Sequence, residues 1–355
     1  MKIAIVHTNW SFGGGMEVYM RSLVKGFLRQ GDDITVYACK ADHRLAAAEG
    51  CELRQIKPVL PRKLREYRFL HLCNRLPLRD RYDFAVSLAR TCSSHVAVCG
   101  GVHKETIRHI RRTALLRKVY DLFENAYEAE SFQHTPWIMA HSRTIARQIR
   151  SHYSIDEKKL KVLYPPIDTE QFFPAEPAIR QATRQTLNIH PDRLTCLFVS
   201  CGHQCKGYEQ LAQAFARLDP DRYELLVAGH DIPRNHPENI RYIGYINNLA
   251  PVYSAVDCTI LPSHYEAFGL AIPESLQCGT PVITTVAAGA AELLTDREAV
   301  VLPDNQPTTL IRAIRQLERH WHIEPGFAQR HHLEIDQHIT RLKALFAPAA
   351  PSLSR

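Results

Sequence analysis

The chain has 355 residues, of which 45% are hydrophobic and 23% are charged, and its formal net charge is +7. This length exceeds what one ordinary hydrophobic core accommodates and predicts two globular domains, and the absence of an apolar run of about 20 residues excludes a membrane-spanning helix. The positive charge indicates an anionic partner and leaves open a nucleic acid, an acidic membrane surface or a phosphorylated substrate.

The N-terminal segment from Met1 to His7 is apolar over too short a stretch for a signal peptide and is typical of a first strand. We therefore expect a cytoplasmic protein. The ten cysteines are scattered without a CxxC pair. Several stand in strand-like runs, where a thiol is usually a small core side chain rather than a metal ligand or nucleophile.

A strand over 2–8 is followed by a glycine turn at 13–15, a helix over 16–30 and a strand over 34–38. This order is typical of the start of a Rossmann-like domain. The three glycines do not form the dinucleotide fingerprint, because Val18 stands where its third glycine belongs. Alone, they predict either a tight turn or a close approach of the backbone to a phosphate.

Strands and helices then alternate to the middle of the chain, which predicts a parallel sheet covered by helices. We expect strands at 52–56, 83–88, 95–100, 137–141 and 160–164, and helices near 62–72, 104–133 and 143–153. Pro165 and Pro166 mark a hinge. The first domain thus covers 1–164.

The second half repeats the alternation, so a second Rossmann-like domain is expected over 165–325. A last helix over 326–346 is predicted to cross back to the first domain, and a frayed tail covers 347–355. Histidines 331, 332 and 338 are interpreted as a solvated face of that helix rather than as metal ligands. The predicted fold is α/β, with two domains facing across a cleft and a ligand at the carboxyl ends of their strands.

The most informative stretch lies between the strands expected at 258–261 and 282–284. It contains a glycine turn and a helix, with Glu266 in the loop and Glu274 inside the helix. The end of a strand and the start of a helix offer backbone amides to an anion. We therefore predict a binding site for a phosphate-bearing ligand whose hydroxyls bind Glu266 and Glu274. Lys206, beside Gly207 in another strand-to-helix loop, suits a diphosphate.

These residues resemble the signature of the family 4 retaining glycosyltransferases of GT-B fold. The matching motifs extend from residue 14 to residue 292: Gly14-Gly15-Met16-Glu17 (GGxE), Pro165–Phe172 (PNGVDxxxF), Lys206-Gly207 (KG), Glu266-x7-Glu274 around Phe268-Gly269-Leu270, Gly279-Thr280-Pro281-Val282, and Gly289-x2-Glu292 (GGxxE). Within the family, the chain is most similar to the glucosyltransferase of the lipopolysaccharide core, with weaker support from residues 127–132 and the basic helix before them.

The resemblance implies that a hexose moves from a nucleotide sugar, which we expect to be UDP-linked, to an acceptor hydroxyl with retention. It also implies that the domain over 1–164 binds the acceptor and the domain over 165–325 the nucleotide sugar. A leaving phosphate oxygen assists as base, so no carboxylate pair at glycosidase spacing is needed. No metal and no cofactor other than the nucleotide sugar as co-substrate is expected. The implied roles are ribose binding for Glu274, donor-sugar contact for Glu266, sugar and phosphate contact for the amides of Phe268, Gly269 and Leu270, diphosphate stabilisation for Lys206 and the Gly14–Gly15 loop, and a position near the sugar for His103.

Two features depart from the family pattern. Ser200 and Cys205 stand where the family has arginines, and Arg90 or Arg143 could replace them. The sequence Asp219-Pro220-Asp221 imitates a metal-binding DxD motif but lies between a helix and a strand, so we interpret it as a turn.

The excess of positive charge has a location. One segment carries a single acid, Glu105, among six basic residues: Lys104, Arg108, Arg111, Arg112, Arg117 and Lys118. A second cluster comprises Arg62, Lys63, Arg65, Arg68 and Arg75. They form either a solvated surface or, as we favour, a docking site for anionic lipid at about 1 kcal/mol per basic residue.

We therefore expect a peripheral enzyme on the inner face of the cytoplasmic membrane, acting on the lipopolysaccharide core or another lipid-linked glycan. One alternative is a transferase for a capsule or another soluble glycan. A basic nucleic-acid-binding protein is a remote alternative, because the chain has neither a recognition-helix motif nor a stacking platform. No nucleic-acid partner is expected.

Overall fold

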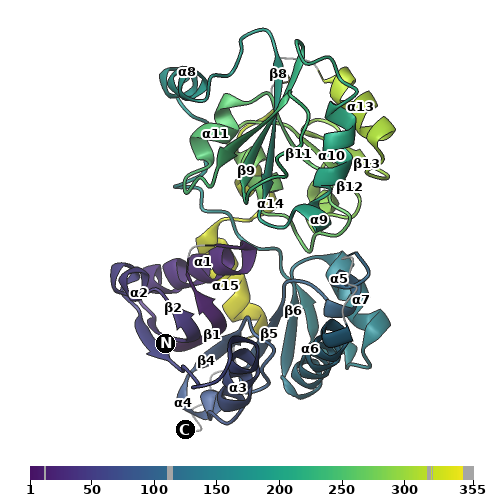
Figure 1. Ribbon diagram of the computed structural model, residues 1–355. Coiled ribbons are helices and arrows are strands. Elements are labelled where there is room, and N and C mark those ends of the chain that lie inside the picture. Colours follow the sequence, from purple (N-terminus) through teal and green to yellow (C-terminus); the bar gives the residue numbers. More distant parts are fainter. Residues whose placement is uncertain (12, 110–114, 318–320, 322, 347–355) are drawn as a thin grey trace. The chain divides into compact units, whose positions relative to one another are not determined.

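The computed structural model describes all residues except 12, 110–114, 318–320, 322 and 347–355 (Figure 1). The chain forms two units. The first comprises Met1–Pro166 with Leu333–Arg355, and the second comprises Ile167–His332. The tail expected to be frayed lies outside the described residues.

The first unit contains a seven-stranded sheet in the order β3-β2-β1-β4-β5-β6-β7, in which all paired strands are parallel. Its strands are β1 (Lys2–Trp10), β2 (Asp33–Ala41), β3 (Glu52–Gln55), β4 (Phe84–Ser87), β5 (Val96–Cys99), β6 (Trp137–Ala140) and β7 (Leu160–Val162). The strand order reverses between β1 and β4, and an open sheet of this kind binds ligands at the carboxyl ends beside such a reversal.

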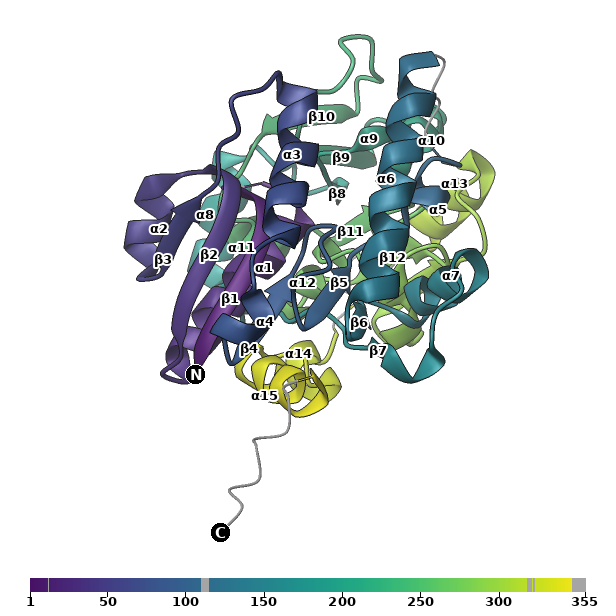
Figure 2. The same cartoon turned by 90° about the horizontal axis from the view of Figure 1, so that it is seen from below.

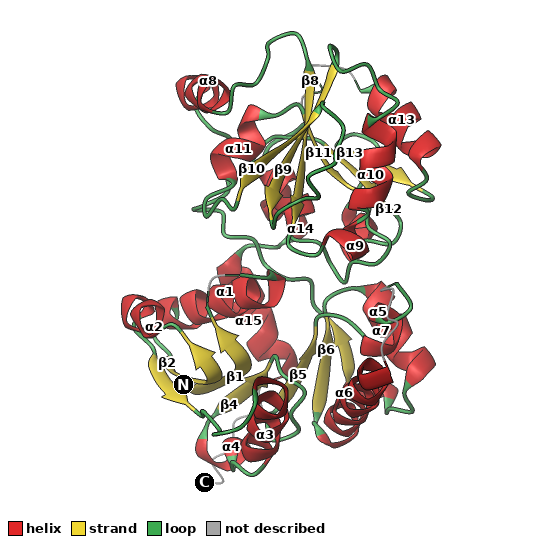
Figure 3. Ribbon diagram, viewed as in Figure 1, coloured by secondary structure: helices red, strands yellow, loops and turns green. Residues whose placement is uncertain are grey.

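Helices cover both faces of this sheet (Figure 3). They are α1 (Gly15–Arg29), α2 (His43–Glu49), α3 (Arg62–Asn74), α4 (Leu78–Arg81), α5 (His103–Thr106), α6 (Leu115–His134), α7 (Arg143–His152) and α15 (Ile335–Phe346), with a 3-10 turn at Glu157–Lys159. Alternate side chains of β1 divide between the faces. Ile3 and Ile5 pack in the core that includes residues of α1 and α15, whereas Ala4 and Val6 pack in the core that includes Phe69 of α3.

The second unit contains a six-stranded parallel sheet in the order β10-β9-β8-β11-β12-β13. Its strands are β8 (Leu194–Ser200), β9 (Tyr223–Gly229), β10 (Ile240–Gly244), β11 (Cys258–Leu261), β12 (Val282–Thr285) and β13 (Ala299–Leu302). Its helices are α8 (Pro177–Thr186), α9 (His203–Lys206), α10 (Tyr208–Phe215), α11 (Ala250–Ala255), α12 (Ala271–Gln277), α13 (Pro307–Gln316) and α14 (Phe327–His331), with a 3-10 turn at Gly289–Leu293. Two Rossmann-like α/β units, each with a parallel sheet, therefore make up the chain.

Two predicted helices differ from the structure. The helix expected over 104–133 is interrupted, because α5 ends at Thr106, turns follow at 107–109, and α6 begins at Leu115. The density of basic residues explains the break, since like charges three or four residues apart destabilise a helix. The helix expected over 326–346 is also two helices, α14 and α15, separated at His332, whose φ of 55° is left-handed.

Helix α15 is anchored to the first unit by a buried polar contact. Nδ1 of His338 donates to the carbonyl oxygen of Tyr164 (3.0 Å), so Nε2 is the acceptor for the Tyr19 hydroxyl (2.9 Å). His338 is 1% exposed, so the expected solvated histidine face is wrong at this position. The sequence pattern did not reveal it because the partners lie 174 and 319 residues away.

This anchor predicts acid sensitivity. Burial lowers the pKa of both His338 and the neighbouring His141 to about 3. Unfolded histidines bind protons near pH 6.5, so the unfolded state holds more protons between pH 6.5 and 3. Stability conferred by these neutral rings is therefore complete above pH 6.5 and is lost as the pH falls, by up to roughly 1.4 kcal/mol per pH unit for each histidine.

Urea unfolding at pH 7, 6 and 5, followed by circular dichroism, measures this slope. A His338→Gln variant, whose amide can replace both hydrogen bonds, is expected to lose about half of it. His134→Gln, at an exposed position, is the control. An unchanged slope in His338→Gln would contradict the assignment.

Among the described residues, no helix combines the length and the apolar composition that a bilayer span requires.

Candidate active site

Two loops at the carboxyl ends of neighbouring strands meet in the second unit. The connection between β8 and α10 carries Lys206, the last residue of the short helix α9, and the loop after β11 carries Glu266. The amide of His264 donates to the carbonyl oxygen of Cys205 (2.8 Å), which joins the loops directly. Parallel strands place these loops at one sheet edge, as the sequence predicted.

Lys206 and Glu266 form an ion pair at this edge. Nζ of Lys206 lies 3.5 Å from Oε2 of Glu266, and the side chains are 25% and 20% exposed. The backbone of Glu266 is held on both sides, because its amide donates to Ala287 (3.3 Å) and its carbonyl oxygen accepts from Gly289 (3.0 Å). The GGxxE-like segment that begins at Gly289 thus supports the Glu266 loop.

Glu274 lies one turn inside α12, which begins after Phe268, Gly269 and Leu270. Phe268 is buried, and Gly269 has a φ of +91°, a conformation that favours glycine. Oε2 of Glu274 accepts from the buried Tyr253 hydroxyl (3.0 Å). Burial raises the pKa of Glu274 to about 7, against the opposing effects of the Tyr253 hydrogen bond and the positive charge of Lys206.

The carboxyl of Glu274 is therefore poised between its protonated and ionised forms at neutral pH. A ligand that donates hydroxyls to it would stabilise the ionised form. Such a group can bind a diol such as a ribose, and the charge of Lys206 can attract a phosphate in the same unit.

Sequence reasoning missed the residues that support this site. Tyr253 binds Glu274, and Nε2 of His264 contacts Gln210 (3.0 Å) while its Nδ1 accepts from the Asn305 amide (3.0 Å). These contacts join residues 21 to 54 positions apart. No local spacing signals them, because each partner comes from a different loop or helix.

Gly207 provides a test of the Lys206 loop. Its φ is +81°, and a Cβ there would collide with the carbonyl oxygen of Pro262. Gly207→Ala is therefore expected to lower the free energy of unfolding by about 2–4 kcal/mol and to displace Lys206. Urea unfolding together with nucleotide-sugar binding would measure both effects.

Gly202, five residues earlier, is the matched control. Its φ is −145°, and a Cβ would meet no atom within 4 Å. Gly202→Ala should therefore behave as the wild type. Equal stability of the two variants would contradict the strain assigned to Gly207.

In the first unit, Gly14 and Gly15 lie exposed at the start of α1. Gly14 is the residue before the helix and is extended, with φ −73° and ψ 178°. Glu17, in the first turn, has Oε1 3.8 Å from Nε2 of His7. The GGxE-like segment therefore forms the start of α1, after the connection from the carboxyl end of β1.

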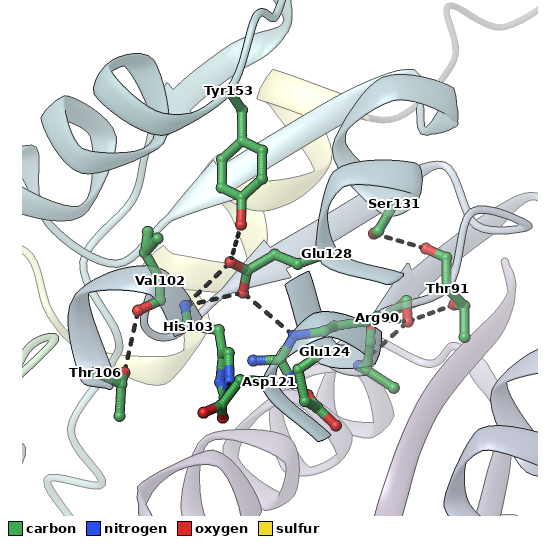
Figure 4. A network of polar contacts seen from close by, with 12 residues as sticks. Arg90, Thr91, Val102, His103, Thr106, Asp121, Glu124, Glu128, Ser131 and Tyr153 are labelled. Carbon is green, nitrogen blue, oxygen red and sulfur yellow. Dashed lines mark hydrogen bonds and ion pairs between the residues drawn. The ribbon is translucent and has the colours of Figure 1, made fainter. Parts of the chain in front are cut away.

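His103 begins α5 after β5, and acidic residues of α6 hold it (Figure 4). Its Nε2 lies 3.0 Å from Oδ1 of Asp121, and its backbone amide donates to Glu128 (3.0 Å). His103 is 6% exposed. The sequence predicts His103 just after a strand but reveals neither acidic partner. It predicts one continuous helix over 104–133, in which Asp121 and Glu128 would not turn back toward His103.

Arg90 is bound within the first unit rather than presented as an open guanidinium. It lies 2.5 Å from Glu124 and 3.2 Å from Glu128 (Figure 4). Ser200 and Cys205 stand where the family pattern has arginines. The hydroxyl of Ser200 accepts from the amide of Gly202 (3.2 Å), and the carbonyl oxygen of Cys205 accepts from the amide of His264. Arg143, the other suggested replacement, begins α7 of the first unit.

The basic segment is only partly a free surface. Lys104 donates to the carbonyl oxygen of His152 (3.1 Å) and lies over the ring of Tyr153, so it is engaged with α7. Arg108 pairs with Glu105 (2.8 Å) while 62% exposed, and Lys118 is exposed. Arg111, Arg112 and the side chain of Arg117 lie outside the described residues.

The DxD-like sequence is a turn. The amide of Asp221 donates to the Asp219 carboxylate (3.0 Å), and the amide of Tyr223 to the Asp219 carbonyl oxygen (3.0 Å). Among the residues that the structure describes, no group of three or more His, Cys, Asp or Glu side chains is arranged to hold a metal ion.

Two family models match the chain. Residues 13–171 match Glycosyltransferase Family 4, and residues 179–332 match Glycosyl transferases group 1. A probable transglycosylase of Burkholderia thailandensis is 29% identical over 99% of this chain and 98% of its own length. A D-inositol 3-phosphate glycosyltransferase of Geodermatophilus obscurus is 28% identical over 61% of this chain and 53% of its own length.

Solved structures share the fold. WaaG, a glycosyltransferase involved in lipopolysaccharide biosynthesis, matches with a TM-score of 0.76 at 20% identity over 97% of this chain and 96% of its own. Anabaena HepE, crystallised with UDP and glucose, matches with a TM-score of 0.76 at 14% identity over 98% of this chain and 100% of its own. The two family models correspond to the two units. The chain is therefore a glycosyltransferase of GT-B fold, with a family 4 domain in its first half and a group 1 domain in its second.

Proposed function

We propose that this glycosyltransferase moves a hexose, with retention, from a nucleotide sugar to a hydroxyl of a lipid-linked glycan such as the lipopolysaccharide core. The observation that carries the donor assignment is the convergence of Lys206, Glu266 and Glu274 in the second unit. A buried carboxyl beside a lysine suits a ligand that combines a diol with a diphosphate. UDP is the favoured nucleotide, supported by the UDP complex of the HepE neighbour.

In this proposal, Glu274 accepts hydrogen bonds from the ribose hydroxyls and Glu266 from the donor sugar. The amides of Phe268, Gly269 and Leu270 contact the sugar and phosphates. Lys206 stabilises the charge that develops on the leaving diphosphate, a contribution that is strongest in the transition state. In the first unit, the Gly14–Gly15 loop and His103 contribute to the same reaction, with Asp121 orienting the histidine ring.

The donor assignment is tested with a panel of UDP-, GDP- and ADP-sugars. One nucleotide series should raise the melting temperature and be hydrolysed slowly without acceptor, and hydrolysis should persist in EDTA because no metal is invoked. The same assays on Glu238→Ala, an exposed glutamate of the second unit, control for surface changes. Failure of every nucleotide sugar in both assays would refute the proposal.

A surface of the first unit favours a membrane-bound acceptor. Helices α3 and α6 lie side by side (Figure 2), and the ring of Phe123 lies 5.5 Å from that of Tyr67. Large apolar side chains are exposed on and before these helices: Val59 (99%), Leu64 (54%), Val119 (48%), Leu122 (69%) and Phe123 (52%). Lys118 is exposed beside them. We name these five apolar residues the apolar ridge.

An apolar ridge beside the exposed Lys118 suits an anionic bilayer, because apolar side chains insert while a cation meets lipid phosphates. Sedimentation with vesicles containing phosphatidylglycerol tests this docking. Leu122→Asp should reduce the bound fraction, whereas Phe173→Asp, at a residue of the second unit that is 51% exposed, should not. If the wild type does not sediment with vesicles, the alternative of a capsule or soluble glycan acceptor gains support.

A further inference from the structure

Helix α9, which carries Lys206 as its last residue, is too short to hold itself in place. It has four residues, His203–Lys206, and none of them is buried. A single helical turn of this kind is unstable without contacts to the rest of the protein. The position of Lys206 therefore depends on hydrogen bonds that tie α9 to neighbouring loops.

The start of α9 is tied by the side chain of His203. Its Nδ1 lies 2.9 Å from the Ser200 hydroxyl, and its Nε2 lies 3.0 Å from the carbonyl oxygen of His230. Because a carbonyl oxygen only accepts, Nε2 carries the proton. This ring joins the start of α9 to the loop after β9 and leaves the other end of the helix, which carries Lys206, to different contacts.

The end of α9 is tied to the loop after β11. The amide of His264 donates to the carbonyl oxygen of Cys205 (2.8 Å), the residue immediately before Lys206. Gly207, immediately after the lysine, packs so closely on the carbonyl oxygen of Pro262 that a Cβ would collide with it. The segment 262–264 therefore contacts the chain on both sides of Lys206.

The ring of His264 uses both of its nitrogens. Asn305 is buried, and its Nδ2 lies 3.0 Å from the carbonyl oxygen of Pro262 and 3.0 Å from Nδ1 of His264. The contact with a carbonyl oxygen identifies this atom as the amide nitrogen, so it donates to both partners. Nδ1 of His264 therefore carries no hydrogen, and the proton is on Nε2, which donates to Oε1 of Gln210 in α10 (3.0 Å).

His264 thereby joins three connections at the carboxyl edge of the second sheet. Its own loop follows β11, Asn305 follows β13, and Gln210 belongs to the helix that follows α9. Glu266 stands two residues after His264, and Lys206 stands four residues before Gln210. The ring therefore links the two chain segments whose side chains form the 3.5 Å ion pair.

We infer that His264 is a positioning residue of this enzyme: its ring holds Lys206 beside Glu266 where the transfer step requires the cation, and so determines kcat. The inference rests on the proposed function, which places the leaving diphosphate at Lys206. A preorganised cation stabilises the transition state because it does not have to move when the charge develops. Displacement of such a group by about 1 Å can reduce the rate roughly a hundredfold.

Removal of the ring nitrogens should lower turnover more than binding. His264→Leu is expected to lower kcat about ten- to a hundredfold, whereas KM for the nucleotide sugar should rise less than about threefold. Hydrolysis kinetics with the nucleotide sugar identified by the panel measure both constants. The value of kcat is calculated per folded enzyme, with the folded fraction taken from circular dichroism at the assay temperature. A loss of stability alone therefore leaves this kcat unchanged.

His264→Asn tests the hydrogen bond rather than the volume of the side chain. Asparagine is close to leucine in shape, and its oxygen can take the place of Nδ1 as an acceptor for Asn305. This variant should keep a kcat at least about fivefold above that of His264→Leu, since a buried donor keeps its partner. His190→Leu is the matched control, because His190 is exposed and its ring accepts from the amide of Asp192, two residues away (3.1 Å). It should behave as the wild type.

Combination with Lys206→Met separates positioning from general support of the fold. If His264 acts through the lysine, His264→Leu should change kcat less than about threefold in an enzyme that already lacks the cation. A residue that merely supported the fold would reduce kcat by the same factor with and without Lys206.

Three results would overturn the inference: an unchanged kcat in His264→Leu, equal kcat values for the leucine and asparagine variants, or the same loss with and without Lys206. A wild-type chain that hydrolyses a nucleotide sugar keeps the proposed function in each of these cases. A wild-type chain that neither binds nor hydrolyses any nucleotide sugar fails the proposed function itself, and the role of His264 falls with it.

Discussion

Glu274→Ala is expected to lower kcat/KM for the nucleotide sugar by about two to three orders of magnitude. A hydrogen bond to a charged group contributes roughly 1.5–3 kcal/mol, and a carboxylate that holds a ribose can accept two. These contacts exist in the ground state as well as the transition state, so most of the loss should appear in KM. Steady-state kinetics with the donor identified by the panel would measure it.

The pH dependence gives this prediction a second readout. Because the pKa of Glu274 is raised to about 7, kcat/KM of the wild type should fall as the pH drops below 7 and the carboxyl takes up a proton. Glu274→Gln should be weaker throughout, and its profile should lose this step. Tyr253→Phe removes the donor to Oε2 and should shift the step to higher pH.

Glu238→Ala serves as the matched control, since it removes an exposed carboxylate from the same unit. Full activity of Glu274→Ala would refute the ribose-binding role.

Lys206→Met should lower kcat by about two to three orders of magnitude and raise KM much less. The methionine keeps most of the length of the side chain but removes the cation that faces a departing diphosphate, where negative charge grows in the transition state. Removing one preorganised stabilising group of this kind typically costs 10²–10³ in kcat. Lys206→Arg should retain part of the activity, because a positive charge remains.

Arg222→Met is the control, because Arg222 is exposed immediately before the amino end of β9, away from the carboxyl-end loops of that sheet. The pair between Lys206 and Glu266 (3.5 Å) also predicts coupling. Lys206→Met combined with Glu266→Gln should lose less than the two single effects multiplied. Loss of activity that appears only in KM would contradict a transition-state role for the lysine.

The sequence predicted the donor half of the site better than the remainder, for a physical reason. Lys206, Glu266 and Glu274 each stand at a fixed distance from a glycine in a strand-to-helix loop, and parallel strands place such loops at one sheet edge. The positions of these three residues therefore follow from local sequence, namely from the alternation of strands, glycine turns and helices. The structure brings Lys206 and Glu266 into contact accordingly.

Contacts between distant elements were not predictable in the same way. Tyr253 belongs to a short helix whose pattern indicates only burial, yet its hydroxyl binds Glu274. The sequence predicts Glu128 and Asp121 as part of one long basic helix, whereas α6 presents Asp121 to His103 and Glu128 to both His103 and Arg90. His338 was expected in solvent and is instead a buried link to Tyr19. In each case tertiary packing determines the partner, and the spacing of residues along the sequence does not indicate it.

Helix α15 belongs to the first unit although it follows the second unit in the chain, and this has a consequence for folding during synthesis. Gly26 of α1 packs so closely on Ile339 of α15 that a Cβ at Gly26 would collide with it, and α15 follows the second unit in the chain. The N-terminal unit therefore cannot complete its core when its own first 166 residues have been made. The second unit, continuous from Ile167 to His332, has every residue it needs earlier. The usual N-to-C order of domain folding during synthesis is thus reversed in its final step, because the first unit can complete its core only with a helix that follows the whole second unit in the chain.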